Sequence, residues 1–322
     1  MRLFYEWGTR QVHKHGEELC GDNIAFSRKP DWVTLALSDG LGSGVKANIL
    51  ATLTTQIAIR MLEDNLPMGE VVQTLSETLP VCAIRKVAYS TFAIAQFFSE
   101  GYARVVEFDS PHAIVLRERK ILPVTYEERV VDGKTIHETV LNLQEGDWVV
   151  FVSDGVLNAG IGGAYPLGWG WELAAGFLEK HAHRGLTAEE LADKVAEAVS
   201  ELYLGKPGDD VSIVVIKVRH KQVATVFTGP PAKGGADGQL VHRFVNRMGK
   251  LVVCGGTTAK IVAKHLGQPL EVDHIHFIVG QAMNPAHQNP DLPHQLGIRM
   301  TVVREIAAEL RNRNREVTFE VV

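Results

Sequence analysis

Four short motifs in the first two thirds of the chain each carry an aspartate beside a glycine. They are GDN, SDG, a second SDG and GDD, and their first acidic residues are Asp22, Asp39, Asp154 and Asp209. Any one of them alone is typical of an ordinary turn, because Asp and Gly are favoured turn residues. Together they offer four carboxylates, and hard oxygen ligands of this kind suit Mg²⁺ or Mn²⁺. If the four meet in space, cations are needed to offset their mutual repulsion.

The stretch SDGLGSG, residues 38–44, follows an apolar run and precedes a helical pattern. Three roles are open to such a turn: cradling a phosphate, holding a metal ion, or making a tight corner. Its glycines alternate as G-x-G-x-G, which is not the fingerprint of dinucleotide-binding turns. The second SDG and the accompanying GDN and GDD favour the metal role. A glycine after the aspartate lets a backbone carbonyl or a substrate come close.

Short β-like runs are expected to position these carboxylates. Asp39 and Asp154 directly follow apolar runs at 32–37 and 148–152, so each emerges at the end of a buried strand. Asp209 stands just before a run at 211–218, and Asp22 just before Ile24-Ala25-Phe26, so several strand ends can converge. Further strands are predicted at 91–98, 102–108 and 113–117, the first two joined by a Ser-Glu-Gly turn typical of an antiparallel hairpin.

Helical patterns separate the strands. They lie at 45–63, 70–79, 171–182 and 188–204, and Thr187 is the expected N-cap of the last. Strands in runs with helices grouped between them predict an α+β fold, with helices layered on antiparallel sheets rather than a doubly wound βαβ fold.

The composition changes near residue 222. The stretch TGPPAKGGADG, residues 228–238, concentrates Pro and Gly as a linker or long loop does. We therefore predict two domains, 1–221 and 222–322. The second is a smaller α/β domain, with a helix near 239–247, a strand at 250–254, a helix ending near 265, and a closing helix and strand within 301–322.

Two features of this second domain could bind a ligand. In LVVCGGTTAKIVAKHLG, residues 251–267, Thr257 or Thr258 is expected to cap the helix, and free N–H groups there could hold an anion. A tight corner without a ligand is the favoured interpretation. His274 and His276 share one face of a β-like run, with His287 and His294 further on, but no Cys or Glu spacing supports a metal site. A sensing, docking or dimerising role is the most that these features indicate.

Composition excludes several function classes for the 322-residue chain. Its net charge of −5 gives no electrostatic case for nucleic acid or an anionic membrane as the main partner. Three scattered cysteines are too few for a disulfide framework, which favours a reducing, cytoplasmic setting. Neither an apolar leader at the N-terminus nor an apolar run of about 20 residues is present, so we expect no membrane partner.

The ordered motifs resemble those of the metal-dependent protein phosphatases of type 2C. Within these, residues 1–220 are most similar to the bacterial branch typified by stage II sporulation protein E and the regulators of anti-sigma-factor networks. The shared order is GDN, then SDGLGSG leading into a helix, then DWVVFVSDG, then GDDVSIVV on a strand. The resemblance implies an antiparallel β-sandwich flanked by helices, with two Mn²⁺ or Mg²⁺ ions at one edge.

Carried over motif by motif, the resemblance implies a ligand set. Asp22, Asp39, Asp154 and Asp209 would bind metal, joined by the backbone carbonyl of Gly40. Asp210 ranks below Asp209, because relatives carry Asp or Asn at its place. The segment 107–117 is similar to the family's NAGHPP strand pair and brings His112 near the family's histidine, although a polar hairpin turn explains it equally well.

The activity implied is hydrolysis of phosphoserine or phosphothreonine on a protein by a water activated between two ions. The usual substrate in that branch is a small anti-anti-sigma-type protein. The helices at 45–63 and 70–79 act there as a switch, but plain core is the safer interpretation of their apolar faces. Two alternatives stay open: a catalytically weak scaffold whose C-terminal domain is the active module, and a metal-dependent hydrolase of a small phosphorylated metabolite. A homodimer is also open.

Overall fold

The computed structural model describes residues 2–78, 90–163, 165–221, 223–229 and 235–268. The chain forms two compact units, Met1–His220 and Lys221–Val322. Among the described residues, no helix combines the length and apolar character needed to cross a bilayer.

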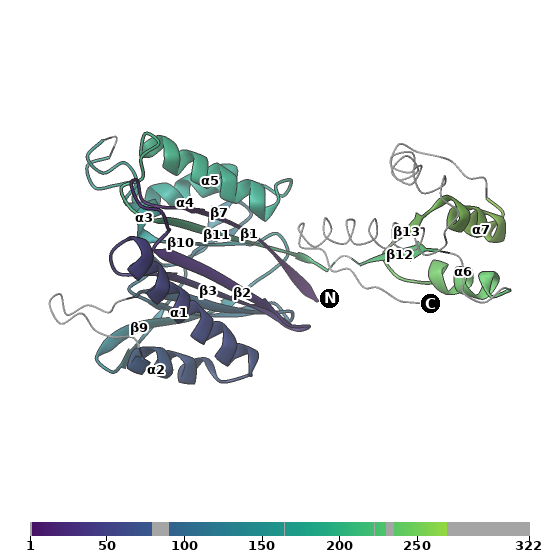
Figure 1. Ribbon diagram of the computed structural model, residues 1–322, viewed down its shortest axis with the longest axis horizontal. Coiled ribbons are helices and arrows are strands. Elements are labelled where there is room, and N and C mark those ends of the chain that lie inside the picture. Colours follow the sequence, from purple (N-terminus) through teal and green to yellow (C-terminus); the bar gives the residue numbers. More distant parts are fainter. Residues whose placement is uncertain (1, 79–89, 164, 222, 230–234, 269–322) are drawn as a thin grey trace. The chain divides into compact units, whose positions relative to one another are not determined.

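The first unit is built on two antiparallel sheets that pack face to face (Figure 1). Leu35 and Phe97 from one sheet and Phe151 and Ile216 from the other share one buried cluster, so the main core lies between the sheets. The six-stranded sheet has the order β2 (Asp22–Arg28), β3 (Trp32–Asp39), β4 (Phe92–Phe98), β5 (Tyr102–Phe108), β9 (Lys134–Asn142), β8 (Glu127–Val131). The five-stranded sheet has the order β1 (Leu3–Val12), β11 (Val211–His220), β10 (Trp148–Val152), β6 (Ile114–Arg117), β7 (Lys120–Ile121).

Helices cover the outer face of each sheet (Figure 1). On the six-stranded sheet, α1 (Gly44–Glu63) and α2 (Met68–Thr78) bury residues such as Leu62 and Leu75 against Ile94. On the five-stranded sheet lie α3 (Asp154–Leu157), α4 (Gly170–His181) and α5 (Ala188–Leu202), which bury residues such as Leu178 and Leu191. The result is an α+β sandwich with helix layers outside both sheets, which confirms the fold class predicted from the sequence.

The predicted cap of α5 is present. Thr187 Oγ1 accepts a hydrogen bond from the Glu190 N–H at 3.1 Å, and the Glu190 carboxylate accepts one from the Thr187 N–H at 2.7 Å. This reciprocal pair satisfies N–H groups that would otherwise lack partners at the helix start. It fixes where α5 begins, and α5 packs along β1 and β11.

The second unit contains a parallel strand pair, β12 (Ala224–Thr228) and β13 (Lys250–Cys254), together with α6 (Asp237–Val245) and α7 (Gly256–Leu266). The expectation of a threonine cap on α7 is wrong. Gly255 occupies the N-cap position, and Thr258 Oγ1 instead accepts a hydrogen bond from the Gly229 N–H at 3.0 Å. The hydroxyl therefore ties α7 to the residue after β12. The predicted closing helix and strand, and His274, His276, His287 and His294, lie outside the described residues.

Candidate metal centre

The register of β2 and β3 places Asp22 directly opposite Asp39. Side chains along a strand alternate between the two faces of its sheet. Leu35 and Leu37, four and two residues before Asp39, lie in the core between the sheets, so Asp39 is directed toward the same layer. The first two carboxylates thus meet at the end of the sandwich, in the layer where both sheets face each other.

The second pair of motifs reaches this place from the other sheet. Asp154 is the first residue of α3, directly after β10, and Asp209 precedes β11, the antiparallel neighbour of β10. Gly155 brings the two segments into contact, because a Cβ at that position would lie 2.0 Å from the backbone oxygen of Asp210. The glycine of the second SDG is therefore required by close packing of two backbones.

The carboxylates interact electrostatically. Burial, followed by the charges of Asp22, Asp154 and Asp209, raises the pKa of Asp39 to about 9. Burial also raises the pKa of Asp22 to about 7, with smaller contributions from Asp210 and Asp154. The pKa of Asp209 is raised as well, first by burial and then by Asp154. The structure thus brings all four predicted aspartates within reach of one another's charge.

Buried carboxylate oxygens without partners test whether this group suits a cation. Asp22 Oδ1 and Oδ2 and Asp210 Oδ2 are buried and accept no hydrogen bond from the part of the chain that the structure describes. The hydroxyls of Ser212 and Ser153 lower the pKa of Asp22 without reaching hydrogen-bond geometry. Unpaired buried charge is costly, and a divalent cation would satisfy these oxygens. The donor set fits a hard cation.

The coordination geometry itself is less complete. Within the described ranges, no three His, Cys, Asp or Glu side chains are arranged so that they could together hold one metal ion. The four aspartates interact through their charges, and their side chains would have to reorient to converge on an ion.

Gly40 ties this group to the first helix. A Cβ on Gly40 would lie 2.2 Å from the backbone oxygen of Ala47 in α1, so only glycine permits this approach. The backbone around it is held by hydrogen bonds from the Gly40 N–H to Gly21 O at 3.3 Å and from the Thr91 N–H to Asp39 O at 2.9 Å. The position of α1 and the position of Asp39 are therefore mechanically linked.

Comparison with known proteins identifies the family. Residues 29–219, more than half of the chain, match the family model described as Stage II sporulation protein E. The chain belongs to the stage II sporulation protein E family. A curated relative, stage II sporulation protein E of Bacillus subtilis (strain 168), is 20% identical over 224 residues, which cover 66% of this chain and 26% of the relative. The chain thus spans about a quarter of that relative's length.

Solved structures of stage II sporulation protein E share the fold. One holds the type 2C phosphatase domain and a fragment of the regulatory domain of the Bacillus subtilis protein, with a TM-score of 0.58, 18% identity, and coverage of 69% of this chain and 65% of that one. Another holds the phosphatase domain alone and has a TM-score of 0.52 at 18% identity. The match covers 71% of this chain and 99% of that one. The type 2C domain of SiaA from Pseudomonas aeruginosa has a TM-score of 0.50 at 16% identity. The match covers 65% of this chain and 85% of that one. At these identities the likeness shows a common fold.

Two residues around the aspartates, Lys14 and Tyr203, were missed by sequence reasoning in this member of the stage II sporulation protein E family. The Lys14 N–H donates to Asp210 Oδ1 at 3.0 Å, and its ammonium lies 4.0 Å from Asp209 Oδ1. The Tyr203 hydroxyl donates to Gly155 O at 2.7 Å, and burial with the nearby acidic charges raises its pKa to about 12. Asp210, ranked below Asp209, is 4% exposed, whereas the Asp209 side chain is 40% exposed. No local pattern signals contacts between residues almost 200 positions apart.

His112 belongs to a different group of side chains. Its Nδ1 lies 2.6 Å from Glu107 Oε2, and the fully buried Glu107 also accepts hydrogen bonds from the Ala113 N–H and the Tyr126 hydroxyl. His112 stacks on Tyr126 with 4.2 Å between the ring centroids. The loop from β5 to β6 crosses from the six-stranded to the five-stranded sheet and is fastened by a buried carboxylate, so the interpretation of this segment as a hairpin turn is wrong.

Proposed function

We propose that the chain is a metal-dependent protein phosphatase that hydrolyses phosphoserine or phosphothreonine on a protein. The observation that carries this proposal is the grouping of four aspartates, from four separate motifs, at one end of the sandwich. Two of these motifs, GDN with Asp22 and GDD with Asp210, also hold buried carboxylate oxygens that accept no hydrogen bond from the described residues. Membership of the stage II sporulation protein E family supports the same reaction class.

Asp22, Asp39, Asp154 and Asp209, with the backbone carbonyl of Gly40, would hold two Mn²⁺ or Mg²⁺ ions. Such ions, when bound, supply a water of lowered pKa and offset charge on a phosphoryl group. In this ligand set the buried Asp22 and the half-buried Asp39 come from one sheet, and the half-buried Asp209 and the exposed Asp154 come from the other. The Lys14 ammonium beside Asp209 places a positive charge at the open side, where an anionic substrate would approach.

The substrate proposed is a phosphorylated regulatory protein of bacterial signalling, of the anti-anti-sigma type, in the cytoplasm. The support for it is the family itself, together with the absence of a strongly basic composition that would favour a nucleic acid. Hydrolysis of a small phosphorylated metabolite would use the same carboxylates, and a substrate screen separates the two.

The direct test is hydrolysis of p-nitrophenyl phosphate, then of phosphoproteins, by the purified chain with Mn²⁺, with Mg²⁺ and with chelator. We expect metal-dependent activity that Asp39→Asn abolishes. Asp31→Asn is the matched control, since Asp31 is a surface residue paired with Arg2 outside the cluster. Activity that persists in the presence of chelator, or that Asp39→Asn leaves unchanged, would contradict the proposal.

Calorimetric titration with Mn²⁺ distinguishes the enzyme from a catalytically weak scaffold. The proposal predicts saturable binding that weakens in Asp22→Asn and Asp39→Asn. A scaffold would bind Mn²⁺ feebly or not at all, whatever residue stands at these positions.

A further inference from the structure

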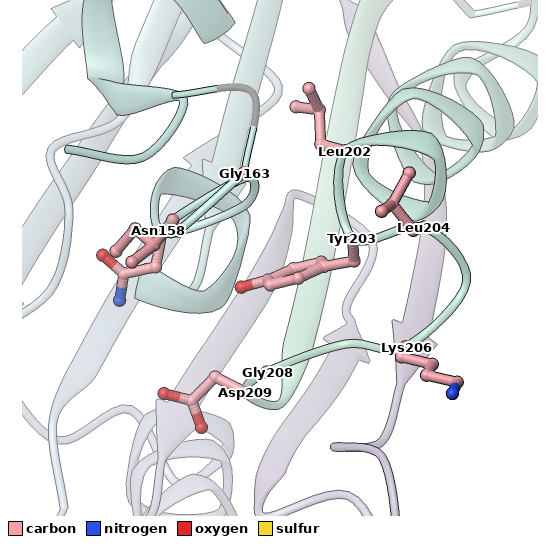
Figure 2. A pocket seen from close by; sticks show the side chains of 10 residues that line it. Asn158, Gly163, Leu202, Tyr203, Leu204, Lys206, Gly208 and Asp209 are labelled. Atoms are coloured by element: carbon pink, nitrogen blue, oxygen red, sulfur yellow. The ribbon is translucent and has the colours of Figure 1, made fainter. Parts of the chain in front are cut away.

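A cavity of about 420 Å³ opens beside the aspartate group (Figure 2). Asp209 forms part of its wall. The loop after α3, with Asn158 and Ile161, lines one side, and the end of α5 with the following turn, including Tyr203, Leu204 and Lys206, lines the other. Its volume lies within the range of small-ligand sites in proteins.

The two walls are fastened to each other and to the acidic motifs. The Tyr203 ring projects from the end of α5 toward the loop that carries Asn158 (Figure 2), and its hydroxyl donates to Gly155 O. The Asn158 N–H in turn donates to Asp154 O at 2.8 Å. The cavity is therefore held by the same residues that place Asp154 and Asp209.

Leu204 occupies this cavity's rim in an unfavourable conformation. The end of α5 closes with hydrogen bonds from the Leu204 N–H to Glu201 O and from the Gly205 N–H to Ser200 O, a pattern in which the first of these donors is usually glycine. Leu204 instead holds the left-handed backbone conformation, with φ of 53°, and is 86% exposed. Glycine would be less strained there and would expose less apolar surface.

Ile161 faces the same cavity from the opposite wall and is 56% exposed. Two large apolar side chains thus stand in water on either side of one opening. Neither the exposure of Leu204 nor its backbone conformation stabilises the fold, and exposed apolar side chains and backbone strain both cluster at binding sites.

We propose that this cavity is a specificity subsite for an apolar side chain next to the phosphorylated residue of the protein substrate. The inference rests on the proposed phosphatase function. Asp209 belongs both to the aspartate group and to the cavity wall, and successive residues of an extended chain are only about 3.3 Å apart, so residues next to the phosphorylated one are within reach of the cavity. Lys206 on the same wall adds positive charge that suits an anionic phosphopeptide.

The test uses synthetic phosphoserine peptides of alanine and glutamine, in which one leucine is moved from three residues before to three residues after the phosphoserine. With the full chain and Mn²⁺, we expect one or two leucine positions to raise kcat/KM about tenfold over the peptide without leucine. In Leu204→Ala and Ile161→Ala, the ratio of kcat/KM for the leucine peptide to kcat/KM for the peptide without leucine should fall toward one. Leu167→Ala is the control, since Leu167 is 91% exposed and is not part of the cavity lining.

Leu204→Gly separates a binding role from a structural one. It should raise the Tm, because glycine suits the left-handed conformation, and should still abolish the leucine preference. Hydrolysis of all the peptides at equal kcat/KM would overturn the subsite alone. Absence of hydrolysis of every peptide and of p-nitrophenyl phosphate would overturn the phosphatase, and the subsite with it.

Discussion

Asp22 and Asp39 face each other across two antiparallel strands, at the point where β2 begins and β3 ends. Burial raises the pKa of Asp22 to about 7 and that of Asp39 to about 9, and the neighbouring carboxylates add to both shifts. In the chelated protein near neutral pH, the folded chain therefore retains protons that the unfolded chain has released. This relationship makes stability depend on pH and on cations.

The chelated protein should lose stability as pH rises from about 4 to about 9. Both aspartates release their protons near pH 3.8 when unfolded but only near 7 and 9 when folded, so the folded state binds more protons throughout that window. Each extra proton lowers the free energy of unfolding by up to about 1.4 kcal/mol per pH unit. Thermal unfolding in chelating buffer at several pH values measures this slope.

Asp39→Asn should flatten the slope, most clearly between pH 7 and 9, where Asp39 is the later of the pair to ionise. Asp31→Asn, on the surface, should leave it as it is. A chelated wild-type protein whose Tm is constant from pH 5 to pH 9 would contradict the raised pKa values of Asp22 and Asp39.

Mn²⁺ or Mg²⁺ should raise the Tm, and more at pH 8 than at pH 5. A ligand that binds only the folded chain stabilises it by about 2.7 kcal/mol at 100 times its Kd, which corresponds to several degrees for a domain of this size. The carboxylates must lose their protons to bind, so the effect grows with pH. Differential scanning fluorimetry detects the shift, and an equal shift in Asp22→Asn would place the binding elsewhere.

Gly155→Ala should destabilise the first unit by about 1–3 kcal/mol and abolish the proposed phosphatase activity, because the added methyl meets the backbone of Asp210. Gly176→Ala is the matched control. Gly176 lies inside α4, and a methyl group added there would have no neighbouring atom within 4 Å, so alanine should stabilise by about 0.5–1 kcal/mol. Urea denaturation compares the two, and equal effects would refute the close-packing role of Gly155.

Much of this fold is predictable from local pattern. The strands 102–108 and 148–152 are continuous apolar or alternating runs, and the structure has them with the same ends. The helices near 45–63 and 188–204 follow from their periodicity, and the cap at Thr187 from its residue type. Such elements bury one face whatever their partner, so the sequence alone carries their signal.

The elements that escaped prediction depend on distant partners. Gly8 lies inside β1, and glycine is required there because a Cβ would lie 2.4 Å from the backbone of Glu189 in α5. Strand β8 exposes most of its residues and is defined by its pairing with β9, so it has little periodicity of its own. In the candidate site, the aspartates carried a motif signal, whereas Lys14 and Tyr203 enter only through the tertiary fold.

Glu107→Gln should lower the pKa of His112 toward the ordinary histidine value of about 6.5. The hydrogen bond and charge of Glu107 raise that pKa in the folded protein, in spite of partial burial. Protonated His112 therefore contributes stability that is present at low pH and is lost as pH rises through its folded pKa.

Titration of the His112 ring protons by NMR measures the effect directly. Glu128→Gln is the control, because Glu128 is an exposed acid that lies 3.6 Å from the neighbouring His137, whereas the carboxylate bonded to His112 is that of Glu107. We expect the His112 titration to move in Glu107→Gln and to stay in place in Glu128→Gln. If both variants titrate like the wild type, the buried carboxylate does not control the charge of His112, and the fastening of the β5–β6 loop would be independent of pH.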